Sequence, residues 1–525
     1  MNINFNFKKK ILFLLFLLPN LLLSDLLIDQ IIEANNELLI PLELKVQNFV
    51  KGNYETSSKI KKIELLDDKK NFLKRLDDPI KLNNSFYFLT NDIKNFYIKV
   101  YANESVKCKI DIENIQAINY EKDENEIISQ TIKNQKIKLQ TNQDTTQFWK
   151  EIEKIGTPLI EKIDNDEYIL TFLYKGAKES VKLLGGPSSE HVFLDRLENS
   201  DIWYKSYRVK KGVKFSYQLA PDVPNIKGNN REKRVAILST AQMDPFNKMP
   251  YQYSLDLNLD KYSKLSTIEI KDENSFDWSQ NLNAKEGKII DTKIKSHILA
   301  NERNLSIYLP NNFNNKKEFQ VLFVFDGLDY QLKVPTPRIL DNLIENKKII
   351  PTIAVFIDNP SKEARATELP ANKDFAYFMA YELLPFIKKE LDIEFLAKNT
   401  ILTGSSYGGL ASMYVAFTYP EFFANVLSQS GSFWWSPKDD EEPEWLTRQI
   451  ANTKKKEINI YLNAGIYETG YSSIDILESN RHLRTILKAK GYENVIFEEY
   501  LSSHDYFAWK SYLANGLIKL QEMKD

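Results

Sequence analysis

A serine flanked by glycines follows an apolar stretch in the last third of the chain. Residues 404–409, Gly-Ser-Ser-Tyr-Gly-Gly, come directly after the strand-like residues 400–403 and before the apolar, helix-like residues 410–417. In this strand–turn–helix setting, the spacing G-x-S-x-G is typical of a sharp turn that lifts the hydroxyl of its central serine above a sheet. Larger side chains two positions before or after the serine would clash there. We therefore predict Ser406 as a nucleophile, and a plain glycine-rich turn is the alternative.

The region around this turn has the pattern of a mainly parallel sheet. After about residue 287, longer amphipathic segments alternate with strand-like apolar runs, which are residues 305–308, 320–325, 352–357, 400–403 and 458–462. Continuous apolar strands separated by helices predict a sheet with helices on both faces. We therefore assign residues 287–525 to a catalytic domain of the α/β-hydrolase fold, with its functional groups at the carboxyl ends of the strands.

Only four histidines are available to act as the base that a serine nucleophile needs. In this fold the catalytic residues follow in the order serine, acid, histidine. His191 and His297 precede Ser406, and His482 lies inside a helical pattern, on a predicted solvated face. His504 follows a strand-like segment and satisfies the order, so we predict it as the base.

A carboxylate must orient this histidine. Glu468 lies just beyond the strand-like residues 458–462, which places it at the same sheet edge as Ser406. Asp475 is the second candidate. Asp505 is a poor candidate because the side chains of neighbouring residues rarely point at each other's ring nitrogen. We predict Glu468 as the acid, and an exposed loop carboxylate is the alternative.

Two backbone N–H groups are needed to stabilise the oxyanion of an acyl-transfer reaction. One is expected from Tyr407, the residue after the nucleophile. The other is expected from the loop after the strand-like residues 320–325, where either Gly327 or Leu328 is suitably placed. The sequence leaves both open.

The amino terminus resembles an export signal. Lys8, Lys9 and Lys10 precede an apolar segment, residues 11–23, that is shorter than a membrane-spanning helix. We predict that residues 1–24 are a signal peptide, that the protein is periplasmic or secreted, and that it has no stable membrane insertion after cleavage. An uncleaved membrane anchor is the alternative.

The remaining residues predict two further domains, since 525 residues exceed what one core usually supports. Short alternating strands separated by Asn, Asp and Lys predict an accessory β-sandwich over residues 25–125. Residues 126–147 are polar and predicted as a linker that turns helical near residues 148–155. Residues 148–286 are predicted as an immunoglobulin-like β domain, so two β-sandwich domains precede the catalytic domain.

Charge and residue counts exclude several classes of function. Lys and Arg total 70 and Asp and Glu total 72, so the broad cationic surface of a nucleic-acid-binding protein is missing. Cys108 is the only cysteine, which rules out an intrachain disulfide. The histidines lack metal-ligand spacing, and we predict no metal site and no cofactor.

Several motifs together resemble the enterochelin esterase family, and the resemblance covers roughly residues 145–525. The motifs lie at residues 365–369, 381–385, 404–409, 427–435, 464–468 and 503–509, with two more at 201–204 and 244–247. The resemblance implies hydrolysis of the trilactone of a ferric catecholate siderophore, which would be the partner as substrate. It also implies that Arg365 contacts this trianion. An ion pair of Arg365 with Glu368 at helical spacing is the alternative.

Two other functions stay open from the sequence. One is hydrolysis of feruloyl or acetyl esters on polysaccharide, in which the first β domain would bind carbohydrate. The other is a non-catalytic siderophore-binding protein, for which Ser406 and His504 would lie beyond hydrogen-bond distance.

Overall fold

The computed structural model describes most of the chain as two compact units. The described residues are 25–46, 48–77, 82–90, 93–116, 126–188, 191–227, 229–251, 260–273, 275–470 and 474–523. The first unit comprises residues 1–118 and 226–239, and the second comprises residues 119–225 and 240–525. The predicted signal peptide, residues 1–24, lies outside the described residues. None of the helices in the described part is long and apolar enough to cross a membrane.

The first unit contains two four-stranded antiparallel sheets, with the strand orders β1-β8-β3-β6 and β2-β7-β4-β5. The strands are β1 Asp25–Ile32, β2 Glu37–Glu43, β3 Asn48–Thr56, β4 Lys62–Leu66, β5 Phe72–Arg75, β6 Asn83–Leu89, β7 Asn95–Tyr101 and β8 Val106–Gln116. In β7, Phe96, Ile98 and Val100 are buried in a core shared by both sheets, while the residues between them are not buried. This period of two is the pattern from which the sheet-rich amino-terminal domain is predicted.

Residues 226–239 belong to the first unit, although the sequence assigns them to the second β domain. Ile226 and Ala236, the latter in helix α3 (Asn230–Thr240), are buried with Phe49 of β3. The ammonium group of Lys74 also donates a hydrogen bond to the carbonyl of Ser239 at 3.2 Å. The sequence prediction is wrong for this segment because a few small apolar contacts between distant residues leave no recognisable pattern.

A helix also lies within residues 126–147, which the sequence predicts as a linker. Helix α1 spans Gln130–Leu139, and helix α2 spans Thr146–Ile155. Ile132 of α1 is buried in one core with Leu173 of the second β domain. The linker prediction is therefore wrong for α1, because its single apolar face is outweighed by the polar residues around it.

The second unit begins with a β domain of two antiparallel sheets, ordered β12-β13-β10-β9 and β11-β14-β16-β15. The strands are β9 Leu159–Lys162, β10 Glu167–Lys175, β11 Val181–Gly185, β12 Asp195–Arg196, β13 Ile202–Lys210, β14 Lys214–Pro221, β15 Pro250–Tyr251 and β16 Leu265–Glu269. Its core contains the rings of Phe172, Phe215 and Tyr217. The immunoglobulin-like topology of residues 148–286 stays a prediction.

The carboxyl-terminal domain contains an eight-stranded sheet with the order β17-β18-β20-β19-β21-β22-β23-β24. The strands are β17 Lys288–Ser296, β18 Asn301–Leu309, β19 Gln320–Phe325, β20 Thr352–Ile357, β21 Thr400–Ser405, β22 Asn425–Gln429, β23 Asn459–Gly465 and β24 Val495–Tyr500. Strands β17 and β18 are antiparallel to their neighbours, and the other six strands run parallel. The mainly parallel sheet predicted from the alternating pattern is confirmed.

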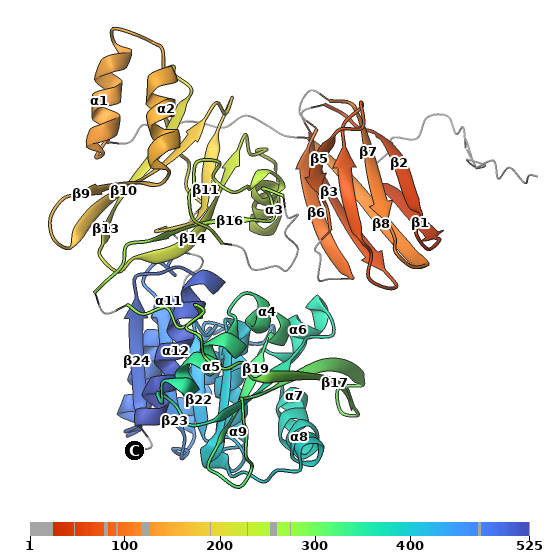
Figure 1. Cartoon of the computed structure of the whole chain (residues 1–525), viewed down its shortest axis with the longest axis vertical. Coiled ribbons are helices and arrows are strands. Elements are labelled where there is room, and N and C mark those ends of the chain that lie inside the picture. The colour runs from red at the N-terminus through yellow and green to blue at the C-terminus, as the bar shows by residue number, and fades with distance from the viewer. Residues whose placement is uncertain are drawn as a thin grey trace, which may run out of the picture. The chain divides into compact units, whose positions relative to one another are not determined.

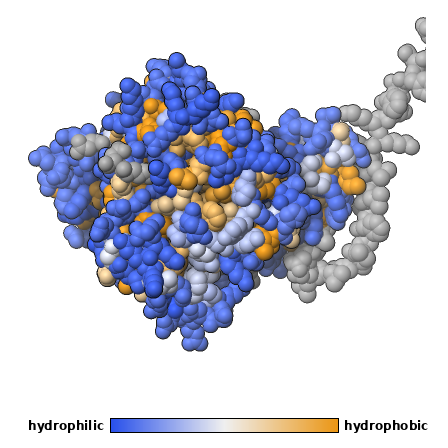
Figure 2. All heavy atoms as spheres, turned by 90° about the horizontal axis from the view of Figure 1, so that it is seen from below, coloured by the Kyte–Doolittle hydropathy of each residue, from blue (hydrophilic) through white to orange (hydrophobic). Residues whose placement is uncertain are grey.

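Helices cover both faces of this sheet (Figure 1). The helices are α4 Gly327–Leu332, α5 Thr336–Glu345, α6 Lys362–Glu368, α7 Lys373–Tyr377, η1 Phe378–Leu383, α8 Leu384–Leu391, η2 Ala397–Asn399, α9 Tyr407–Thr418, α10 Trp445–Asn452, α11 Ile476–Ala489 and α12 Tyr506–Glu522. In β19, Phe323 packs in one core with α8 and α9, and Leu322 packs on the opposite face with α5 and α12. Figure 2 shows one face of the molecule, on which hydrophilic residues predominate and apolar residues form smaller patches. The predicted site residues Ser406, Glu468 and His504 come shortly after the parallel strands β21, β23 and β24, so the core holds them at one edge of the sheet.

Candidate active site

Ser406 occupies a strained turn between β21 and α9. Its φ is 57° and its ψ is −120°, a conformation that non-glycine residues rarely adopt. A Cβ on Gly404 would lie 2.8 Å from the backbone of Gly408, and a Cβ on Gly409 would lie 2.5 Å from Oγ of Ser428. Gly404 is therefore needed for the close approach of the strand and the helix, as the sequence predicts. Gly409 is needed as well, which the sequence does not predict, whereas a Cβ on Gly408 would lie no closer than 3.3 Å to a neighbouring atom.

The loop after β22 surrounds the serine. The amide of Ser406 donates a hydrogen bond to the carbonyl of Gln429 at 3.0 Å, and the amide of Ser432 donates to the carbonyl of Ser406 at 3.1 Å. The two hydroxyl oxygens of Ser406 and Ser432 lie 3.2 Å apart. The sequence pattern does not single out Ser432, although it lies in the Ser-Gln-Ser-Gly-Ser run that follows the strand.

Glu468 and His504 meet at the same edge. The Glu468 side chain is fully buried, and its Oε1 lies 3.6 Å from Nδ1 of His504, whose side chain is 25% exposed. The hydroxyl of Ser430 donates a hydrogen bond to this Oε1 at 2.7 Å, and the indole N–H of Trp509 donates to the Ser430 hydroxyl at 2.9 Å. The Trp509 ring also meets the His504 ring edge to face, with centroids 4.8 Å apart. The imidazole is thus packed beside a carboxylate that Ser430 fixes in place.

Two polar atoms of this pair have no hydrogen-bond partner in the described part of the chain. They are Oε2 of Glu468 and Nδ1 of His504, and both are buried. Buried polar atoms without partners are uncommon and costly, and each calls for an explanation such as a catalytic role. The distance of 3.6 Å between Nδ1 of His504 and Oε1 of Glu468 exceeds that of a hydrogen bond.

The described residues show no hydrogen bond between Ser406 and His504, because the hydroxyl of Ser406 contacts Ser432 instead. The other candidate residues are occupied elsewhere. Asp475 caps α11 by accepting a hydrogen bond from the amide of Glu478 at 2.9 Å. His482 contacts Glu444 through its Nδ1 at 2.7 Å, and its side chain is 47% exposed. The structure therefore places Glu468 next to His504. Among the described residues, Asp475 and His482 bind other partners and form no hydrogen bond with the His504 ring.

The loop after β19 distinguishes the two candidate oxyanion donors. The amide of Leu328 donates a hydrogen bond to Oδ1 of Asp358 at 2.8 Å, so this donor is already used. Burial, together with the nearby charge of Asp329, raises the pKa of Asp358 to about 6. A Cβ on Gly327 would lie 2.6 Å from the amide nitrogen of Ile357, so no larger residue fits there. Gly327 is the better placed of the two residues.

Arg365 of α6 is held by Asp326. Its Nε and Nη2 donate hydrogen bonds to the two carboxylate oxygens of Asp326, each at 2.7 Å. The alternative predicted from sequence, an ion pair with Glu368, is wrong, because Glu368 binds the buried guanidinium of Arg303 at 2.7 Å. The guanidinium carbon of Arg365 lies 5.8 Å from the ring centroid of Tyr407, the residue after Ser406. Arg365 therefore lies near the serine turn, in an orientation fixed by a carboxylate that the sequence pattern does not reveal.

Two family models match the chain. Residues 296–520 match a model described as putative esterase, and residues 175–271 match one described as enterochelin esterase, N-terminal. With the fold and the arrangement of the site, these matches define a carboxylic ester hydrolase. An iron(III) enterobactin esterase of Dickeya dadantii is 25% identical over 403 residues, which are 70% of this chain and 91% of the relative. The two matches and this relative support the assignment of the chain to the enterochelin esterase family.

Further comparisons support the same assignment. An iron(III) salmochelin esterase of Escherichia coli is 25% identical over 399 residues, which are 72% of this chain and 93% of the relative. The structure of the enterobactin esterase of Shigella flexneri, solved in the presence of enterobactin, matches with a TM-score of 0.58 at 23% identity. The match covers 73% of this chain and 100% of that chain. The two proteins therefore share the fold of a β-rich domain followed by an esterase domain.

Proposed function

We propose that the protein is a serine esterase that hydrolyses the ester bonds of a ferric catecholate trilactone of the enterobactin type, so that iron is released. The observation that carries the proposal is the buried carboxylate of Glu468 beside Nδ1 of His504, each with a buried atom that has no hydrogen-bond partner among the described residues. The class of substrate is supported by relatives named as enterobactin and salmochelin esterases. Iron is part of the substrate in this proposal and is not a resident cofactor.

In the proposed reaction, Ser406 attacks the carbonyl carbon of an ester bond of the lactone. His504 accepts the hydroxyl proton through Nε2, and Glu468 orients the ring and stabilises its positive charge. The amides of Tyr407 and Gly327 stabilise the oxyanion. The C–O bond of the ester then breaks, and His504 returns the proton to the leaving alkoxide. Water releases the acyl group from Ser406 by the same steps, with His504 again as the base.

The contact between the Ser406 and Ser432 hydroxyls is compatible with this mechanism. Catalytic hydrogen bonds are often long in hydrolases without substrate and shorten when the substrate binds. A rotation of the Ser406 side chain away from Ser432 frees its hydroxyl for His504. The missing hydrogen bond is also what a non-catalytic siderophore-binding protein predicts, so the wild-type assay must separate the two.

Substrate recognition is proposed to involve Arg365, Tyr407 and Trp434. The ring centroids of Tyr407 and Trp434 lie 6.3 Å apart, and the guanidinium carbon of Arg365 lies 5.8 Å from the centroid of the Tyr407 ring. Ferric tris-catecholate is a trianion built from aromatic rings, which suits a cation beside aromatic side chains. Asp326 accepts hydrogen bonds from two of the five N–H groups of Arg365 and thereby orients it.

Turnover of ferric and iron-free trilactones by the purified wild type and by Ser406→Ala, followed by liquid chromatography, tests the proposal. We expect the variant to lose at least about 10³-fold in kcat while it keeps its fold, because the reaction needs the serine oxygen. Full activity of the variant would contradict the mechanism. Wild-type protein that binds the siderophore without cleaving it would favour a binding protein. A higher kcat/KM for a feruloyl sugar ester than for the trilactones would favour an esterase that acts on polysaccharide.

We also propose that the protein is exported through its amino-terminal segment and acts on siderophore outside the cytoplasm. The basic and apolar pattern of residues 1–24 supports this. Cell fractionation followed by amino-terminal sequencing should recover a chain that begins at Asp25 in the periplasm or medium. Recovery of a cytoplasmic protein with an intact amino terminus would contradict the proposal.

A further inference from the structure

The loop that carries His504 is held by its own domain on one side. The amide of Tyr467, just beyond β23, donates a hydrogen bond to the carbonyl of Ser502 at 3.2 Å. A Cβ on Gly465 would lie only 2.3 Å from that carbonyl oxygen. The loop therefore passes directly over the end of β23, close to the acid Glu468.

On its other side the same loop contacts the second β domain. Strand β14 pairs with β16 along residues 214–217 and with β11 along residues 217–221. Beyond the end of β11, the amide of Lys214 donates a hydrogen bond to the carbonyl of Leu501 at 2.9 Å, and the amide of Ser216 donates to Oδ2 of Asp505 at 3.2 Å. Alternate residues of a strand present their amides to the same edge, so the loop occupies the place of a neighbouring strand.

Asp505 contacts the amide of Ser216 through its carboxylate, which also accepts hydrogen bonds from two other donors. Its Oδ1 accepts a hydrogen bond from the amide of Ala508 at 3.1 Å and so caps α12. Its Oδ2 also accepts from the hydroxyl of Ser503 at 2.9 Å. One carboxylate therefore fixes the two residues that flank the imidazole and the helix that follows it, and joins them to β14.

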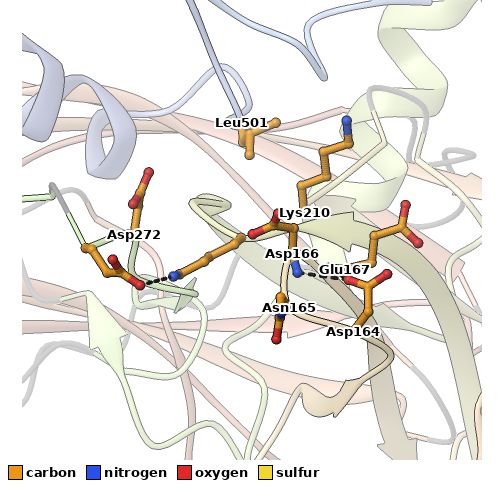
Figure 3. A pocket seen from close by; sticks show the side chains of 9 residues that line it. Asp164, Asn165, Asp166, Glu167, Lys210, Asp272 and Leu501 are labelled. Atoms are coloured by element: carbon orange, nitrogen blue, oxygen red, sulfur yellow. Dashed lines mark hydrogen bonds and ion pairs between the residues drawn. The ribbon is translucent and has the colours of Figure 1, made fainter.

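Apolar contacts support the same junction. The rings of Phe215 and Tyr467 meet edge to face with centroids 6.3 Å apart, and Leu501 packs in the same core. Leu501 also reaches the turn between β13 and β14, where a Cβ on Gly212 would lie 3.5 Å from its Cδ1. Figure 3 shows Leu501 across a pocket from Asp164 and other charged side chains on turns of the β domain.

We propose that Asp505 is a positioning residue for His504 and that β14 of the second β domain is part of the catalytic apparatus. The inference rests on the proposed role of His504 as the base. Asp505 does not touch the reacting atoms in this proposal. It holds the loop against the edge of β14, so that the imidazole stays between Glu468 and the serine turn. A small displacement of a catalytic group is enough to slow a reaction strongly.

Two substitutions separate this role from helix capping. Asp505→Ser keeps a hydroxyl that caps α12 but removes the second oxygen, which meets the amide of Ser216. Asp505→Asn keeps one oxygen that can cap α12, but it replaces the other oxygen with an NH2 group that cannot accept a hydrogen bond from the amide of Ser216. Asn372→Ala is the matched control, because Asn372 caps α7 through the amides of Asp374 and Phe375, far along the chain from the loop of His504.

Kinetics with p-nitrophenyl butyrate and labelling by a fluorophosphonate probe test the proposal in the full-length protein. We expect Asp505→Ser to lower kcat and the labelling rate about 10- to 100-fold with little change in KM. Asp505→Asn should show a similar loss, because its amide nitrogen cannot accept the hydrogen bond from Ser216. Asn372→Ala should stay near the wild type, although it lowers the Tm. If Asp505→Ser keeps the kcat of the control variant at a similar Tm, the positioning role is overturned.

The outcomes also separate this inference from the proposed function. A wild type that reacts with neither reagent overturns the catalytic site and the inference with it. A wild type that reacts with both but leaves trilactones intact overturns the siderophore assignment alone, and the comparison of variants still decides the role of Asp505. If Asp505→Ser does not fold, Asp505→Thr provides a second variant that keeps the cap.

Discussion

The carboxylate of Glu468 is buried beside His504, and the Ser430 hydroxyl donates a hydrogen bond to it. Replacing Glu468 by Ala should lower kcat by about 10²- to 10⁴-fold, because the imidazole loses the group that orients it and balances its charge. Steady-state kinetics with a trilactone measure this effect. Ser430→Ala is the control, and it should cost far less because the carboxylate remains. Equal losses in the two variants would mean that packing, not the charge of Glu468, supports catalysis.

Asp358 gives a pH dependence to folding stability. Burial raises its pKa from the ordinary value near 3.8 to about 6. Between these values the folded state binds more protons than the unfolded state, so the free energy of unfolding falls as the pH rises from about 4 to about 6. The contribution is on the order of 1–3 kcal/mol and is constant above that range. Urea unfolding at several pH values should show a shallower slope in Asp358→Asn than in the wild type, and the remaining slope is expected from Asp505, whose pKa burial also raises to about 6. An unchanged slope in the variant would assign it to other groups.

For single residues, the sequence predicts which side chains at the ends of strands belong to the site. It does not predict which other residues these side chains contact. The glycine pattern and the chain order predict Ser406, His504 and Glu468 as site residues, because each requirement is local to one strand end. The partners of Arg365 and Leu328, which are Asp326 and Asp358, come from other strand ends. These partners are brought together by the register of the parallel strands. That register cannot be predicted from one sequence.

Among the elements, the turn between β21 and α9 tolerates little change. Gly404→Ala places a Cβ 2.8 Å from the backbone of Gly408, and neither backbone can move without shifting the serine. We expect a loss of about 1–3 kcal/mol in the free energy of unfolding and a large loss of activity. Gly408→Ala is a milder comparison, since its nearest contact, with Cβ of Phe325, is 3.3 Å. Thermal unfolding and kcat should rank the two variants in this order. The reverse ranking would show that the turn is not closed by the approach of these glycines.

Some strands and helices can be predicted from the sequence and others cannot. Apolar runs predict β19, β20, β21 and β23 because these strands are buried on both faces. Strand β22 is missed, since its Ser and Gln residues are buried beside the serine turn and break the apolar run. Helix α1 is missed for the opposite reason, because it buries only a narrow apolar face.

For the whole molecule, alkylation of Cys108 measures how readily the first unit opens. Its thiol is 1% exposed in the core of the two sheets, and burial raises its pKa to about 11. We expect no alkylation by iodoacetamide at pH 8 in the native protein and rapid alkylation in denaturant, because the thiolate is the reactive species. Mass spectrometry after timed labelling measures this. Rapid labelling under native conditions would show that the first unit opens readily.

The chain enters the first unit twice, because residues 226–239 return to it after the second unit has begun. Ile226 and Ala236 are buried there with Phe49. A nick introduced near residue 120 would consequently leave the amino-terminal fragment bound through these residues, and only denaturation would separate the two pieces. A recombinant fragment that ends at residue 125 would for the same reason lack a piece of its own interior.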